Sequence, residues 1–212
     1  MGRLFGTDGV RGIAGEDMTC ELAMAIGRAA ATVLAYGRRR RPLVVLGKDT
    51  RISSDMLGAA LAAGLCSVGA DVIDLGVIPT PAVAYLVGKY KADAGVMISA
   101  SHNPYAFNGI KIFNGDGFKL PDELEEQIEN LIEKNDFTYA KGENLGQISH
   151  CTTGARDYIE HLKSTIPYSL EGMNIVVDCA NGSASATART LFEELGANAV
   201  ILHDAPDGVN IN

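Results

Sequence analysis

The segment SASHNP (residues 99–104) has the residue types of a catalytic loop and directly follows an apolar stretch, Ala94 to Ile98. In open α/β sheets, ligands bind just beyond the carboxyl ends of the strands. Pro104 fixes its own φ angle and restricts Asn103 to extended geometry, so the loop leaves the sheet with little freedom. We therefore expect the hydroxyl of Ser101 to be exposed at the edge of a sheet.

A serine in this position is compatible with several kinds of chemistry. A free hydroxyl is a weak nucleophile that needs a base, whereas a phosphorylated serine needs only in-line geometry and positive charge around the transferred group. Lys111, in the segment NGIK (residues 108–111), could supply that charge. A serine hydrolase is less favoured, since GxSxG is absent and no acidic third member can be assigned. Taken alone, the tetrad Ser-His-Asn-Pro is more typical of an ordinary polar turn with His102 at the surface, because short motifs often match by accident.

Other polar residues that resemble site residues favour structural roles. Asp116 is a single carboxylate in a glycine-rich hairpin, which is more typical of a turn than of a metal site. Asn181-Gly182 likewise indicates a turn or a contact between domains. The cysteines are scattered without a CxxC pair, so we expect free thiols in a reducing compartment; they are Cys20, Cys66, Cys151 and Cys179.

Length and composition limit the class of protein. With 212 residues, of which 47% are hydrophobic and 21% charged, the chain has the make-up of a globular enzyme with one and a half or two domains. It has no long apolar stretch and no secretory signal, which favours a cytoplasmic location without membrane contact. The net charge of −8 argues against nucleic acid as a partner, and the arginine run 38–41 is expected in a solvated loop.

The elements that must position Ser101 follow an alternating pattern of strands and helices, typical of an α/β fold with a mixed, mostly parallel sheet sandwiched by helices. We expect this first domain to span residues 1–137. Its strands are predicted over 43–46, 71–75, 94–98 and 109–113, and its helices over 20–36 (largely buried, with Thr19 as cap), 55–68, 79–90 and 121–134.

A second, incomplete domain is predicted over residues 155–212, after a polar and turn-rich linker at 138–154. The alternating pattern restarts there, and the chain stops in a polar loop that does not resemble a domain end. We therefore expect a longer parent protein. The predicted elements are helices over 156–164 and 183–195 and strands over 174–177 and 198–202.

Five motifs occur in the order and approximate spacing of the α-D-phosphohexomutases, which the chain resembles along nearly its whole length. They are FGTDGVRG (5–12), GKDTRISS (47–54), GVIPTP (76–81), ISASHNP (98–104) and NGIKIF (108–113). The opening motif resembles the branch of that family that acts on glucosamine phosphates, as do VVDCANGSA (176–184) and DGVNIN (207–212).

The resemblance implies a role for each matching residue. Ser101 would be the phosphorylated serine, and Lys111 a phosphate contact and general acid or base. The remaining implied residues are Arg11 and His102 as catalytic groups, and Asn103 and Thr7 as phosphate or substrate contacts. Arg11 and Lys111 retain purely structural alternatives, an ion pair and a solvent-exposed side chain. For GKDTRISS we favour internal bonds of Asp49, Arg51 and Ser53 over substrate contact.

The resemblance also implies an activity and a metal. The activity is interconversion of glucosamine 6-phosphate and glucosamine 1-phosphate through a bisphosphorylated sugar, on the route to UDP-N-acetylglucosamine. The metal is Mg²⁺, bound by the phosphate on Ser101 and by three aspartates of a D-x-D-x-D loop. This chain contains no D-x-D, so those ligands are expected beyond Asn212 and the chain alone is expected to be inactive.

Alternative functions are a phosphomannomutase or phosphoglucomutase and a non-catalytic phosphosugar-binding protein. The sequence does not decide whether the protein forms a homodimer.

Overall fold

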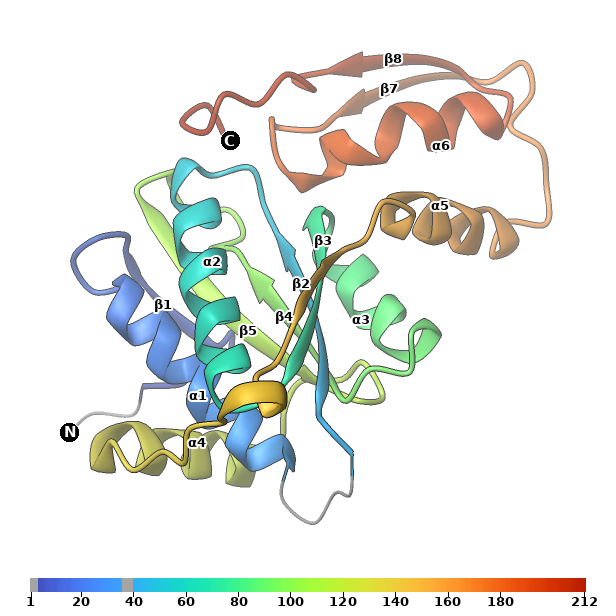
Figure 1. Ribbon diagram of the computed structural model, residues 1–212. Helices are drawn as coiled ribbons and strands as arrows, with labels where there is room; N and C mark the ends of the chain where they lie inside the picture. The colour runs from blue at the N-terminus through green and yellow to red at the C-terminus, as the bar shows by residue number, and fades with distance from the viewer. Residues whose placement is uncertain (1–3, 36–39) are drawn as a thin grey trace.

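The computed structural model describes residues 4–35 and 40–212, and its largest element is a six-stranded sheet with the order β1-β5-β4-β2-β3-β6 (Figure 1). Neighbours from β4 through β2 and β3 to β6 are parallel, while β1–β5 and β5–β4 are antiparallel. The predicted mixed, mostly parallel sheet is confirmed. The strands are β1 (Val10–Ile13), β2 (Leu43–Lys48), β3 (Asp71–Val77), β4 (Ala94–Ile98), β5 (Phe107–Asn114) and β6 (Ile148–His150).

Helices cover both faces of this sheet (Figure 1). On one face lie α1 (Cys20–Ala35), α2 (Ile52–Ser67) and α4 (Asp122–Lys134), and on the other α3 (Thr80–Lys89) and α5 (Gly154–Ser164). The helix predictions are confirmed apart from their ends; α2, for example, begins three residues before the predicted position. Helix α1 begins as expected, since the amide of Leu22 donates to Thr19 Oγ1 over 3.1 Å. It is less buried than predicted, with six of its sixteen residues buried.

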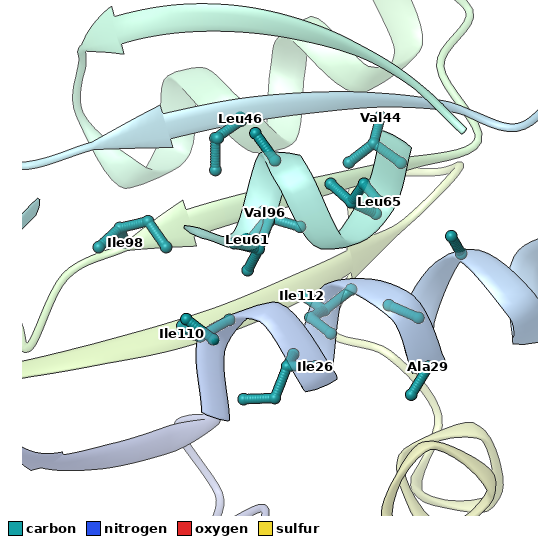
Figure 2. Packing of buried hydrophobic residues seen from close by; sticks show 14 of the residues in the cluster. Ile26, Ala29, Val44, Leu46, Leu61, Leu65, Val96, Ile98, Ile110 and Ile112 are labelled. Carbon is teal, nitrogen blue, oxygen red and sulfur yellow. The ribbon is translucent and has the colours of Figure 1, made fainter. Parts of the chain in front are cut away.

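The alternation of side chains along the strands divides the core into two clusters. Val44, Val96 and Ile112 pack under α1 and α2 (Figure 2), whereas Val45 and Met97, the next residues along β2 and β4, pack under α3. Every residue of β4 is buried. A central strand that is apolar along its whole length is expected where helices cover both faces, and it gives the loop after β4 a rigid base.

Two glycines allow α1 and α2 to cross at close range. A Cβ atom at Gly27 would overlap the backbone of Leu61, and a Cβ atom at Gly64 would overlap the backbone of Met24. The crossing therefore depends on the absence of side chains at these positions.

We predict that Gly64→Ala lowers the free energy of unfolding by about 1–3 kcal/mol, because the added methyl forces the two backbones apart. Chemical denaturation followed by circular dichroism measures this loss. The matched control is Gly88→Ala in α3, where a Cβ atom meets nothing within 4 Å. That variant should be stabilised by about 0.5–1 kcal/mol. Equal effects of the two substitutions would show that helix propensity, and not the crossing, decides the outcome.

A second, two-stranded sheet follows the first. Its strands β7 (Asn174–Asp178) and β8 (Asn198–Leu202) are parallel, as predicted, with α6 (Ala188–Glu194) beside them. The predicted helix over 183–195 is wrong in its first half: residues Ser183–Ala186 form a separate 3-10 turn, and Thr187 adopts a φ of −132° that interrupts the helix. Figure 1 shows this unit above the carboxyl edge of the large sheet.

Two strands of the large sheet were not predicted. The short strand β1 contains glycine and gains its order by pairing with β5, which lies about a hundred residues away in the sequence. Strand β6 lies inside the expected linker 138–154 and is exposed at all three positions, so it has no apolar pattern, yet it pairs with β3. In both cases partners distant in sequence supply the order, which local patterns do not reveal.

The arginine run is only partly covered by the described residues, since Arg38 and Arg39 lie outside them. Arg40 forms a bidentate ion pair with the buried carboxylate of Asp93, over 2.7 and 2.8 Å. Arg41 donates to the backbone carbonyls of Glu143 and Leu145. The described part of the run thus has internal partners.

All four cysteines are free thiols. None of the helices in the described part of the chain is long and apolar enough to cross a membrane.

Candidate active site

The loop after β4 presents Ser101 in an unusual backbone conformation. Ser101 is exposed and has a φ of +57°, in the left-handed region that a residue with a side chain rarely adopts. Its amide donates to Ser99 Oγ over 3.0 Å, and the amide of Asn103 donates to the carbonyl of Ala100 over 3.1 Å. Strained residues persist only where their surroundings hold them, and they cluster at functional sites.

Arg51 holds the serine loop in place through hydrogen bonds to the loop backbone. Its side chain is fully buried, is paired with Asp49, and donates to the backbone carbonyls of Ser101 and Asn103. Asp49 in turn accepts from Ser54 Oγ over 2.8 Å, so the pair is part of a hydrogen-bonded network. The predicted internal role of the GKDTRISS segment is confirmed. No pattern in the sequence indicates that this network also fixes the serine loop, through the bonds from Arg51 to Ser101 and Asn103.

A second support for the loop comes from strand β5. The fully buried Asn108 donates to Ser53 Oγ over 2.9 Å and to Ser54 Oγ over 3.1 Å. A Cβ atom at Gly109 would lie 2.7 Å from the carbonyl oxygen of Val10 and 2.9 Å from that of Ser99. Gly109 is therefore required for β1 and the serine loop to approach β5 from both sides.

A pocket of about 250 Å³ opens beside the serine hydroxyl. Ser101 and His102 from the loop, Lys111 from β5 and Arg11 from β1 all contribute to its walls. The antiparallel pairing of β1 with β5 places Arg11 opposite Gly109, so both cations reach the pocket from neighbouring strands. The structure thus brings the four residues expected to be catalytic to one cavity.

Asp8 also lines this pocket, and it is not among the site residues expected from the sequence. The Asp8 carboxylate lies 3.1 Å from Lys111 Nζ and 3.7 Å from an Arg11 nitrogen. The hydrogen bond and charge of Lys111, followed by the charge of Arg11, hold the pKa of Asp8 below its usual value. Asp8 is within the motif FGTDGVRG, three residues before Arg11, and its place in that motif was the only available signal.

The remaining two expected site residues lie outside the walls of the pocket. Thr7 is exposed in the turn before β1. Asn103 is partly buried, and its backbone carbonyl is used by Arg51. Thr7 and Asn103 stay predictions as phosphate or substrate contacts.

A second pocket of about 360 Å³ lies between the serine loop and the β7–β8 unit, and it shares Ser101 and His102 with the first. Hydrogen bonds join the two sides: Thr50 Oγ1 donates to the carbonyl of Asn181 over 2.6 Å, and Asn212 Nδ2 donates to that of His102 over 2.7 Å. The bond between Thr50 and Asn181 agrees with the contact between domains that was expected at Asn181.

Asp116 lies in a turn, as expected, where its amide donates to Asn114 Oδ1.

The geometry disfavours a serine hydrolase. Ser101 Oγ and His102 Nδ1 are 3.4 Å apart, a long contact, and across residues 4–35 and 40–212 no carboxylate hydrogen-bonds to His102. An orienting acid is what fixes the histidine of a hydrolase triad. By contrast, an exposed serine in one pocket with a lysine and an arginine fits a site for a phosphoryl group, whose negative charge these cations would stabilise.

No cluster of three or more His, Cys, Asp or Glu residues that could hold a metal ion occurs in the part of the chain that the structure describes. The two carboxylates that line the pockets beside Ser101 have other partners, since Asp8 pairs with Lys111 and the buried Asp49 pairs with Arg51. The residues present therefore do not form a metal site by themselves.

Comparison with known proteins adds to this geometry. Residues 2–139 match the sequence profile of a family described as phosphoglucomutase/phosphomannomutase, alpha/beta/alpha domain I. The phosphoglucosamine mutase of Thermoanaerobacter sp. (strain X514) is 61% identical over 100% of this chain and 47% of the relative. That of Clostridium novyi (strain NT) is 56% identical, also over 100% of the chain and 47% of the relative.

A solved structure shows the same fold. It is the crystal structure of a phosphoglucomutase/phosphomannomutase family protein from Burkholderia thailandensis, with a TM-score of 0.83 and 28% identity, over 99% of this chain and 46% of that one. The chain spans about half the length of the curated relatives it matches. Because the family profile matches residues 2–139, which is more than half of the chain, this chain belongs to the phosphoglucomutase/phosphomannomutase family.

Proposed function

We propose that the intact protein is a phosphosugar mutase that carries its transferable phosphoryl group on Ser101. The observation that carries this proposal is the exposed, conformationally fixed hydroxyl of Ser101 in one pocket with Lys111 and Arg11. The phosphoglucosamine mutases that match the whole chain at 54–61% identity support the same activity. The substrate would be glucosamine 6-phosphate, converted reversibly to glucosamine 1-phosphate.

In the proposed reaction, a free hydroxyl of the bound sugar phosphate attacks the phosphorus on Ser101. The bond from phosphorus to Ser101 Oγ breaks as the bond to the sugar oxygen forms. The sugar hydroxyl gives its proton to a base, and the released Ser101 Oγ takes up a proton from a general acid. The bisphosphorylated sugar then turns over in the site and returns its other phosphoryl group to Ser101. Lys111 and Arg11 stabilise the charge on the transferred group, and Lys111 serves as general acid or base.

We propose Mg²⁺ as the metal of the intact protein, where it would neutralise charge on the phosphoryl group. The described residues provide no carboxylate cluster for it, so its protein ligands would lie outside this chain, with the phosphate on Ser101 as the one ligand from within it. We accordingly expect no mutase turnover from the 212-residue chain alone, and turnover from the full-length protein in the same coupled assay with Mg²⁺. Turnover by the 212-residue chain alone would contradict the proposal that the protein ligands of the metal lie outside it.

Three further points are part of the proposal. Residues 1–137 would form domain I, 138–154 the connection and 155–212 the start of domain II; the family match to residues 2–139 supports the first boundary. The free thiols and the metabolic role favour the cytoplasm. A homodimer is compatible with the family but has no support in the described contacts.

The direct test is mass spectrometry of the full-length protein after incubation with a bisphosphorylated hexosamine. We expect one phosphoryl group on the peptide that contains Ser101, and its loss on incubation with excess glucosamine 6-phosphate. Phosphate on another residue would overturn the proposal. Assays with glucosamine, glucose and mannose phosphates then separate the proposed substrate from those of a phosphoglucomutase or phosphomannomutase.

A further inference from the structure

We propose that Asp8 is a positioning residue for phosphoryl transfer: its carboxylate holds Lys111 and Arg11 in the Ser101 pocket and yields them to a phosphoryl group that enters. This role rests on the proposed function of Ser101. It explains why a carboxylate lines a pocket that otherwise has the charge of an anion site. A carboxylate and a phosphoryl group present similar oxygen acceptors to the same cations, so the two compete.

The position of Asp8 is built into the fold. The turn that carries it is closed by reciprocal backbone hydrogen bonds between Gly6 and Gly9, of 3.0 and 3.2 Å. Gly9 has a φ of +84°, and a Cβ atom there would overlap the carbonyl of Ile110, so the turn packs directly on the backbone of β5. Since Ile110 adjoins Lys111, this packing places the Asp8 carboxylate beside the ammonium group and leaves it little freedom to move away.

The charges of the cluster indicate what the carboxylate does. Lys111 and Arg11 contribute two positive charges and Asp8 one negative charge, so the empty pocket keeps one net positive charge from these residues. A phosphoserine adds roughly −1.5 to −2 charges near neutral pH. It can therefore outcompete the single carboxylate. Because the Asp8 side chain is 55% exposed, water can solvate it once the cations turn to the phosphoryl group.

Substitution of Asp8 by asparagine keeps the size of the side chain and removes its charge. We expect the 212-residue Asp8→Asn chain to bind inorganic phosphate about three- to tenfold more tightly than the wild type, because the phosphate no longer displaces a carboxylate. Titration by calorimetry or ³¹P NMR measures the affinity. The matched control is Asp116→Asn, an exposed acid in the turn after β5, which should leave the affinity unchanged.

Unchanged or weaker phosphate binding by Asp8→Asn would overturn the proposal, as would an equal gain for Asp116→Asn. The thermal midpoint of each variant shows whether it folds. Since phosphate binding needs no mutase activity, this titration decides the role of Asp8 even where the proposed function fails.

The second arm uses the full-length protein and tests whether Asp8 acts through Lys111. We expect Asp8→Asn to lower kcat about tenfold with an unchanged or lower KM, because Lys111 loses its alignment while substrate phosphate meets less repulsion. In a Lys111→Ala background the same substitution should lower kcat much less, because Asp8 then has only Arg11 left to hold. An equal fold loss in both backgrounds would show that Asp8 does not act by positioning Lys111.

Discussion

Replacement of Ser101 by alanine in the full-length protein is expected to lower mutase turnover by at least about three orders of magnitude. Without the hydroxyl there is no acceptor for the phosphoryl group and no donor to start a second cycle, and covalent catalysis of this kind has no substitute route. The measurement is a coupled assay of glucosamine 1-phosphate formation, together with mass spectrometry for covalent phosphate. We expect both signals to disappear while the circular dichroism spectrum is retained.

The matched control is Ser99→Ala in the same loop. Ser99 Oγ accepts from the amide of Ser101 over 3.0 Å, so its loss removes one hydrogen bond and no reacting atom. At about 1 kcal/mol for such a bond, turnover should fall by no more than about tenfold and phosphate should remain on Ser101. If Ser99→Ala removed the phosphate and Ser101→Ala did not, the two serines would have to exchange roles.

The location of the serine loop could be predicted from sequence because local signals were sufficient. An apolar run followed directly by polar residues and a proline indicates the carboxyl end of a buried strand, and β4 ends at Ile98 as predicted. The alternating pattern likewise identified the other central strands and the helices that cover them. Their ends were less certain, since side chains in the last turn of an element contact loops that the local sequence does not specify.

The supports of the loop could not be predicted because they join residues that are distant in the sequence. Arg51 reaches the carbonyls of Ser101 and Asn103 across about fifty residues, and Lys111 meets Asp8 across about a hundred. Each is polar and charged, so its sequence pattern is equally typical of an exposed surface residue. Only the pairing of β2 with β4, of β4 with β5 and of β1 with β5 brings these groups to one edge of the sheet.

The left-handed conformation of Ser101 connects this support to the proposed chemistry. A conformation of this kind costs on the order of 1–3 kcal/mol, and the hydrogen bonds from Arg51 to the flanking carbonyls oppose its relaxation. Because Arg51 is buried and paired with Asp49, it cannot follow the loop if the loop moves. Ser101 is thereby held in a fixed position on the wall of the pocket that Lys111 and Arg11 also line, which is the preorganisation that the proposed phosphoryl transfer requires.

Replacement of Lys111 by alanine in the full-length protein is the second change with a large expected effect. The Lys111 side chain lines the Ser101 pocket and is 28% exposed, so it would interact with the proposed phosphoryl group in surroundings partly shielded from water. We expect kcat to fall roughly 10²- to 10³-fold, since the loss combines charge stabilisation with general acid–base assistance. KM should change much less, because the transferred group develops its charge in the transition state.

Two comparisons give this result its meaning. Lys141→Ala removes the same charge from an exposed position outside both pockets and should leave kcat unchanged, which separates a local effect from one of net charge. Lys111→Arg keeps the charge but exchanges a compact ammonium group that can transfer a proton for a guanidinium that stays protonated. Partial recovery of kcat by arginine would assign Lys111 to charge stabilisation, and no recovery to proton transfer. Wild-type kinetics in Lys111→Ala would mean that the ion pair with Asp8 serves the fold alone.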